Sequence, residues 1–132
     1  MVEYQQVVER LGQFGIAEEQ IDTAALQFDM ALILRYVVNY CNLDNGNEIP
    51  EILDLRIIDR ICSEYLMKKK NAGMLEGFDY EQAVKTIKEG DTQIQFASEA
   101  DGTTPEERFN KLVDYLYKGF DKWICKYRRI RW

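Results

Sequence analysis

Residues 104–127, TPEERFNKLVDYLYKGFDKWICKY, carry the clearest structural signal in the chain. Thr104, Pro105 and Glu107 are typical of a helix start, where threonine caps the first turn and proline fits without losing a hydrogen bond. Apolar side chains then recur three and four residues apart, as on one helix face: Phe109, Leu112, Val113, Leu116, Phe120, Trp123, Ile124 and Tyr127. The stretch predicts one continuous C-terminal helix, roughly 34 Å long.

The same helical spacing recurs before this stretch, from the N-terminus to residue 77. A short first helix and turn are predicted in residues 1–21, where Gly12 and Gly15 end the pattern. A third helix near residues 50–70 is predicted to turn its apolar side inward: Leu53, Ile57, Ile58, Ile61, Cys62, Tyr65 and Leu66. Its charged side chains are predicted to lie outward and to form weak surface pairs: Arg56, Asp59, Arg60 and Glu64.

The second helix, from about Asp22 to Asn42, is apolar on most of its circumference. One row runs Leu26, Met30, Ile33, Leu34, Val37 and Cys41. A second row, on much of the opposite side, runs Phe28, Leu32, Tyr36 and Tyr40. Because such a helix needs cover on more than one face, it is either the central helix of the fold or part of a subunit interface.

The period of the pattern changes between residues 78 and 103. Apolar and polar residues alternate in 84–88 and in 92–96, on either side of Glu89-Gly90-Asp91, which predicts a short β-hairpin. The predicted fold is therefore mainly α, a single small bundle of about four helices with this hairpin inserted before the C-terminal helix. Its parts are residues 1–21, 22–77, 78–103, 104–127 and a basic tail at 128–132.

Composition narrows the function classes. The 132 residues include no histidine, which removes the commonest general base and the commonest zinc ligand. Neither a nucleophile with a base nor a phosphate-binding glycine loop is recognisable, so we expect no enzyme activity, no metal and no cofactor. The three cysteines are far apart and are expected to be core residues in a reducing compartment. No targeting segment or membrane span is apparent.

Charge is distributed unevenly along the chain. The net charge is −6, yet residues 118–132 hold six lysines and arginines against Asp121 alone. Cations near a helix C-terminus explain Lys122 and Lys126. They do not explain the apolar Ile130 and Trp132 beyond it, and arginine and tryptophan are enriched at interface hot spots. The end of the chain is therefore predicted to bind a partner.

Four segments together resemble the head–tail connector proteins of long-tailed bacteriophages and prophages, the head-completion subunits that dock on the portal. The resemblance spans about Asp22 to Trp132, and its segments occur in the family's order. They are Tyr40-Cys41-Asn42 with Ile49-Pro50, the helix ending in Tyr65-Leu66, Val84-Lys85-Thr86-Ile87-Lys88-Glu89-Gly90-Asp91-Thr92, and Tyr127-Arg128-Arg129-Ile130-Arg131-Trp132.

The resemblance implies a structural subunit of the virion, made in the bacterial host cytoplasm and located at the head–tail interface. About twelve copies would form a ring beneath the portal protein, extend the DNA channel and join the capsid to the tail. Its partners would be the portal, its own copies, a tail-side stopper or tail-completion protein, and duplex DNA that passes without sequence-specific binding. The implied contact residues are Val84, Ile87, Asp91, Ile94, Phe96, Tyr127, Arg128, Arg129, Ile130, Arg131 and Trp132.

Two other classes of function remain open at this point. The apolar second helix would also suit an adaptor or regulatory module that binds one partner protein. The basic tail would suit a weak nucleic-acid binder, although the acidic balance of the chain is unfavourable for it. Binding through the tail alone would weaken steeply as salt rises.

Overall fold

Residues 1–74 and 104–130 are described by a computed structural model, and within these ranges the chain forms helices and no strand. The predicted mainly α bundle is thereby confirmed in its coarse form. The predicted hairpin, with its segments 84–88 and 92–96, lies outside the described residues. In chain order the elements are α1 (Tyr4–Gln13), η1 (Glu18–Gln20), α2 (Thr23–Tyr40), η2 (Gly46–Glu48), η3 (Glu51–Leu53), α3 (Asp54–Asn71), α5 (Pro105–Lys118), α6 (Phe120–Ile124) and η5 (Cys125–Tyr127).

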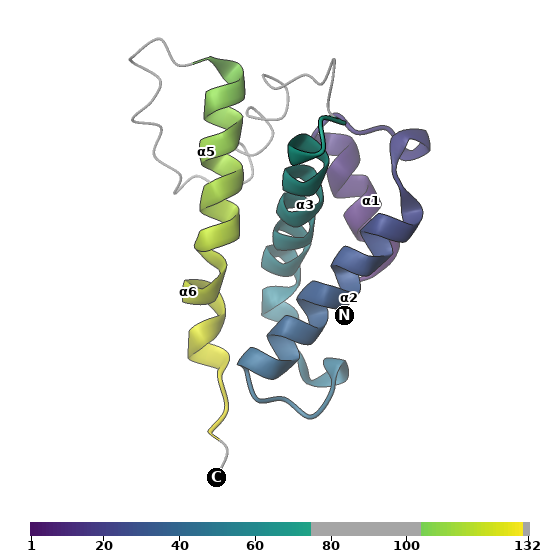
Figure 1. Ribbon diagram of the computed structural model, residues 1–132. Helices are drawn as coiled ribbons and strands as arrows, with labels where there is room; N and C mark the ends of the chain where they lie inside the picture. Colours follow the sequence, from purple (N-terminus) through teal and green to yellow (C-terminus); the bar gives the residue numbers. More distant parts are fainter. Residues whose placement is uncertain (75–103, 131–132) are drawn as a thin grey trace.

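Helix α3 lies at the centre of the bundle. It packs against α1 and α2 on one side and against α5 and α6 on the other (Figure 1). Each of the apolar side chains predicted to point inward from this helix is buried, and residues 61–66 are buried without interruption. The central helix is therefore α3 rather than α2, because α3 is covered on nearly every face.

The prediction that the charged side of α3 lies outward is wrong. Glu64 is only 9% exposed, and Arg56, Asp59 and Arg60 are partly buried. Arg56, Asp59 and Arg60 meet partners from α1 and from the α5–α6 column, whereas Glu64 forms the predicted pair with Arg60 of the same helix. Asp59 accepts a hydrogen bond from Arg10 of α1, and the Arg60 guanidinium lies over the ring of Tyr117 of α5.

Side chains cap two of the helices at the predicted starts. The Asp22 carboxylate accepts a hydrogen bond from the Ala25 N–H at 3.2 Å, and the Thr104 hydroxyl accepts one from the Glu107 N–H at 3.2 Å. Each bond satisfies one of the backbone donors that a helix start leaves without a partner inside the helix. The local sequence thus sets where α2 and α5 begin.

The predicted single helix over residues 104–127 is interrupted at Gly119. Helix α5 ends at Lys118, and α6 and η5 continue the column in two short pieces. A Cβ atom at Gly119 would lie 2.8 Å from the carbonyl oxygen of Tyr115, closer than real Cβ contacts come. The break therefore depends on the absence of a side chain at this position.

Replacing Gly119 with alanine is expected to lower the free energy of unfolding by about 1–2 kcal/mol, because the added methyl meets backbone that cannot rotate away. Urea denaturation followed by circular dichroism measures the change. Gly12→Ala is the matched control: nothing lies within 4 Å of its added Cβ, so alanine in α1 should stabilise slightly. Equal effects at the two glycines would contradict the steric explanation.

Two of the three cysteines occupy the core, as predicted. Cys41 and Cys62 are buried, and burial raises the pKa of both thiols. Cys125 is exposed, so the prediction is wrong for this residue; it lies in η5, after the helical face is interrupted. Within residues 1–74 and 104–130, none of the helices combines the length and the apolar character that crossing a membrane requires.

Candidate interaction surface

The start of the predicted basic tail is fixed to the end of α2. The Arg129 N–H donates to the Cys41 carbonyl oxygen at 2.8 Å, and the Asn42 side-chain amide donates to the Arg129 carbonyl oxygen at 2.6 Å. The Arg129 guanidinium also pairs with the Glu48 carboxylate of η2. Asn42 has a left-handed backbone with φ of 57°, which turns the chain at this contact. We call these contacts the Arg129 latch.

The residues on either side of Arg129 are both exposed, but only Arg128 has a contact with α2. The Arg128 guanidinium lies 5.5 Å from the ring centroid of Tyr40 on α2, whereas Ile130 is 80% exposed. Tyr127 is half-buried against the core. The remaining predicted contact residues lie outside the described ranges: Val84, Ile87, Asp91, Ile94, Phe96, Arg131 and Trp132. The latch therefore determines where the end of the chain leaves the body.

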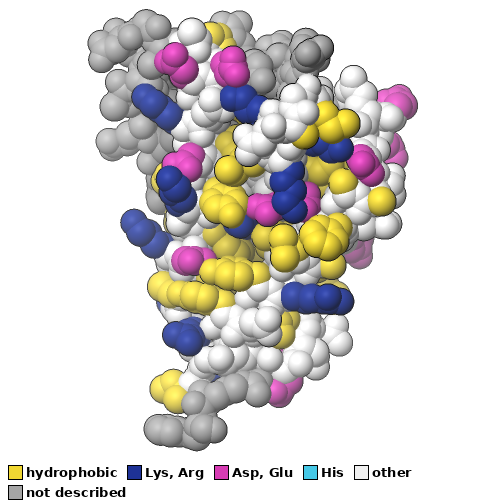
Figure 2. All heavy atoms as spheres, in the orientation of Figure 1, with side chains coloured by type: hydrophobic (Ala, Val, Ile, Leu, Met, Phe, Trp, Pro, Cys, Tyr) yellow, Lys and Arg dark blue, Asp and Glu magenta, His cyan; other side chains and the backbone are white. Residues whose placement is uncertain are grey.

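The second apolar row of α2 is exposed at three of its four residues, and Tyr40 is partly buried against the core. Phe28 is 63% exposed, Leu32 41% and Tyr36 38%, although the other row of the same helix packs on α3. In Figure 2 hydrophobic side chains gather across the middle of this face, between α2 and the α5–α6 column. We call Phe28, Leu32 and Tyr36 the α2 aromatic face. The sequence predicted that α2 is either the central helix or part of a subunit interface. Because α3 is the central helix, the subunit interface is the alternative that remains for α2.

Tyr36 joins this face to α6. Its hydroxyl donates a short hydrogen bond to the Asp121 carboxylate, and its ring stacks on Tyr40 with centroids 5.8 Å apart. The ring of Phe120 lies 6.3 Å away at a tilt. Burial and the adjacent Asp121 carboxylate raise the pKa of Tyr36 to about 12, so the phenol keeps its proton for donation well into the alkaline range. Tyr36 thus connects the face to α6.

Cations from α3 border the same face. Lys68 Nζ lies 5.2 Å from the Phe28 ring centroid, and the Arg60 guanidinium lies 3.8 Å from that of Tyr117. Cations over aromatic rings contribute about 0.5–1 kcal/mol each at exposed sites. The result is an aromatic surface bordered by a lysine and an arginine, and of these the aromatic residues and arginine are enriched at protein interfaces.

Two carboxylates that are nearly buried hold these cations in place. Asp29 of α2 is 2% exposed and accepts a hydrogen bond from Lys68 at 2.7 Å, while Glu64 pairs with Arg60 at 2.9 Å. Burial raises the pKa of Asp29, although Lys68 opposes the shift. The hydrogen bond to Asp29 in turn raises the pKa of Lys68. Sequence reasoning missed Asp29. The signal that could have found it is a single acidic residue among the apolar residues of the second helix, together with a run of lysines at the end of the third helix that could supply its partner.

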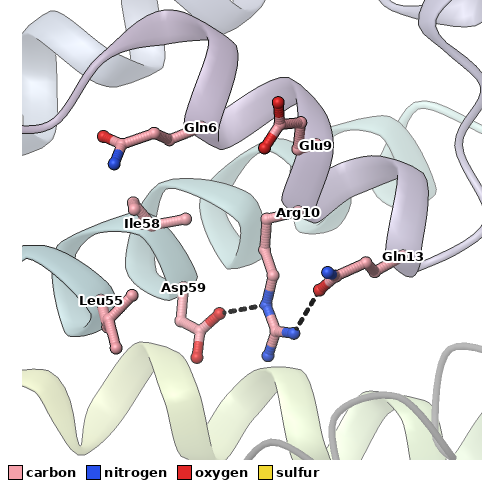
Figure 3. A pocket seen from close by; sticks show the side chains of 7 residues that line it. All are labelled: Gln6, Glu9, Arg10, Gln13, Leu55, Ile58 and Asp59. Atoms are coloured by element: carbon pink, nitrogen blue, oxygen red, sulfur yellow. Dashed lines mark hydrogen bonds and ion pairs between the residues drawn. The ribbon is translucent and has the colours of Figure 1, made fainter.

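A separate groove of about 400 Å³ lies between α1 and α3. Figure 3 shows Arg10 extending into it between Asp59 and Gln13, to which it donates hydrogen bonds of 2.8 and 2.7 Å. The guanidinium also lies 4.7 Å from the Phe14 ring. The hydrogen bond between Arg10 and Asp59 therefore links α1 to α3, and the polar groups of the groove are partners of one another.

The described residues contain no group of three or more histidine, cysteine or acidic side chains placed to hold a metal ion. Comparisons with models of protein families, with curated proteins and with solved structures find no match. The resemblance to phage connectors therefore remains a prediction.

Proposed function

We propose that the chain is a structural head–tail connector subunit, which docks on a portal through the α2 aromatic face and the C-terminal segment. The observation that carries this proposal is the continuity of the two surfaces. Arg128, beside the Arg129 latch, lies over Tyr40, and Tyr40 stacks on Tyr36 of the aromatic face. Exposed aromatic residues beside an anchored basic segment suit a protein partner, because such anchors dominate interface energetics. The proposal assigns the chain no catalytic step.

The nucleic-acid alternative is less well supported by the contacts of the tail. Arg129 is paired with Glu48, and Arg128 lies over Tyr40, so both cations already have partners within the chain. Binding to phosphates would have to break or share these contacts. The adaptor alternative uses the same aromatic face. It differs from the connector proposal in the partner bound: a protein other than the portal.

Mixing the purified chain with a purified portal ring tests the proposal. Phe28→Ser with Leu32→Ser is expected to weaken docking by about 30-fold, which corresponds to losing a hot spot of about 2 kcal/mol. Ile52→Ser with Leu55→Ser is the matched control: these side chains are 72% and 77% exposed and belong to η3 and α3 rather than to the α2 aromatic face. Affinity is measured by biolayer interferometry, and ring complexes are observed by negative-stain microscopy.

The contribution of the chain end is tested separately. Deleting residues 131 and 132 removes an arginine and a tryptophan and leaves the residues of the Arg129 latch in place. Weaker docking with unchanged thermal stability would support a direct contact by these residues. A wild-type chain that ignores the portal would overturn the connector proposal, and equal losses in the aromatic variant and its control would overturn the assigned surface.

A further inference from the structure

The outer side of the α5–α6 column carries a groove that the contacts above leave unused. It has a volume of about 500 Å³ and lies between aromatic and basic side chains. Tyr115 and Trp123 supply its aromatic surface, and Lys118, Lys122 and Lys126 recur along it at four-residue intervals. The three lysines are exposed. The groove thus offers an apolar contact bordered by positive charge.

Trp123 is held in this groove from the side of the core. The Arg56 guanidinium of α3 lies 3.6 Å from the centroid of its ring. Among the acids nearby, Asp114 lines the groove and pairs with Lys118 at 3.1 Å, and Asp121 is occupied by Tyr36. Lys122 and Lys126 therefore dominate the charge at the α6 end of the groove.

The opposite edge of the molecule is acidic. Residues 1–22 contain five acidic side chains and one arginine, and that arginine, Arg10, is bonded to Asp59. Glu18 and Glu19 project from η1 and are exposed. Figure 1 places η1 and the α5–α6 column on opposite sides of α3. In Figure 2 acidic side chains gather over η1, whereas lysines and arginines, with some acidic side chains between them, line the outer edge of the column.

We infer that the α5–α6 groove of one molecule binds the η1 edge of a second copy, with Glu18 and Glu19 placed against Lys122 and Lys126. The charge complementarity of the two edges selects this occupant. Nucleic acid suits the groove less well, because the chain as a whole carries a net charge of −6, which repels phosphates. That copies meet at all rests on the proposed function, in which they form a ring.

The arrangement of the two edges determines the kind of assembly. Two different surfaces on opposite sides of one chain make a head-to-tail contact, which closes into a ring or extends into a filament. Exposed ion pairs contribute little individually, about 0–1 kcal/mol each. The contact is therefore expected to be weak for one pair of molecules, sensitive to salt, and effective only when repeated.

Charge reversal on both edges gives a specific test. Lys122→Glu with Lys126→Glu makes the groove acidic, and Glu18→Lys with Glu19→Lys makes the η1 edge basic. Each variant alone then carries two edges of the same sign and should remain monomeric. An equal mixture restores opposite charges at every contact and should associate about tenfold more tightly than either variant alone.

Sedimentation velocity at low salt measures the association, and circular dichroism checks that each variant is folded. The control is Lys111→Glu alone, since Lys111 is exposed on α5 but lies outside the groove. This variant keeps the basic groove and the acidic η1 edge, so it should associate like the wild type. A mixture that stays monomeric at every concentration overturns the inference, as does duplex DNA binding that Lys122→Glu with Lys126→Glu abolishes. If the mixture associates but the wild type does not bind the portal, the connector proposal fails and the contact between copies stands. If the wild type binds the portal but the mixture stays monomeric, the contact between copies fails and the connector proposal stands.

Discussion

Replacing Ile61 with alanine is expected to lower the free energy of unfolding by about 3 kcal/mol, within the range for large-to-small changes in a core. Ile61 is fully buried in α3, the helix that all the other long helices contact. The lost side chain leaves a space that several elements would have to move together to fill. Urea denaturation followed by circular dichroism measures the loss.

Leu55→Ala is the control for this prediction, because Leu55 lies on the same helix and is 77% exposed. Its effect should stay below about 0.5 kcal/mol, as for most surface substitutions. Comparable losses at the two positions would show that α3 is not the helix around which the bundle packs.

Replacing Lys68 with methionine is expected to cost about 2 kcal/mol at neutral pH. The substitution leaves the Asp29 carboxylate buried without its cation, which costs about 3–5 kcal/mol for a fully buried pair. The expected loss is smaller here because the Lys68 side chain is 49% exposed and water screens the pair. Lys118→Met, which breaks only the exposed pair with Asp114, is the control and should cost less than about 0.5 kcal/mol.

The loss at Lys68 should shrink as the pH falls. Burial already raises the pKa of Asp29, and without Lys68 it should rise further, so the folded variant binds this proton more tightly than the unfolded chain does. The variant therefore recovers stability as the pH falls through the folded pKa of Asp29 toward its unfolded value of about 3.9. In the wild type, Lys68 has a raised pKa, so its contribution is complete below its unfolded pKa and is lost as the pH rises through the folded one.

Chemical denaturation at several pH values, from about pH 4 to pH 8, measures this recovery. A second variant, Asp29→Leu with Lys68→Met, removes both charges and should regain most of the stability at neutral pH. A loss at Lys68 that does not change with pH, or a double variant no better than the single one, would show that Asp29 is not the source of the cost.

Local sequence predicted the features of this fold that local interactions determine. Asp22 and Thr104 cap helices because their side chains reach backbone donors three residues away. The inward face of α3 follows from the spacing of its isoleucines and leucines, since one helix face must be buried. Thus the helical class and two helix starts could be inferred from the chain alone.

Other features depend on residues far apart in the sequence. Arg60 and Glu64 looked like a surface pair because nothing in their spacing shows that α5 covers them. The Arg129 latch requires Cys41 and Asn42 to meet the chain end, a contact that no local pattern encodes. Gly119 was visible as an exception within a helical pattern, but the apolar spacing on either side favoured one continuous helix.

The candidate surface was predicted only in part. The exposed row of Phe28, Leu32 and Tyr36 follows from the excess of apolar residues on α2, and the basic chain end follows from its charge. Their proximity at Tyr40 is a tertiary result, because it depends on how the α5–α6 column packs across α3. The contact residues predicted within 84–96 lie outside the described residues.

The position of Trp123 gives the molecule a built-in optical reporter. Its indole lies on α6 against the guanidinium of Arg56, which belongs to α3. If α6 separates from α3, the indole loses this neighbour and becomes hydrated, so its fluorescence emission moves to longer wavelengths. The only other tryptophan is Trp132, so Trp132→Phe would leave a single emitting indole. Its emission spectrum would then report whether α6 is packed on α3.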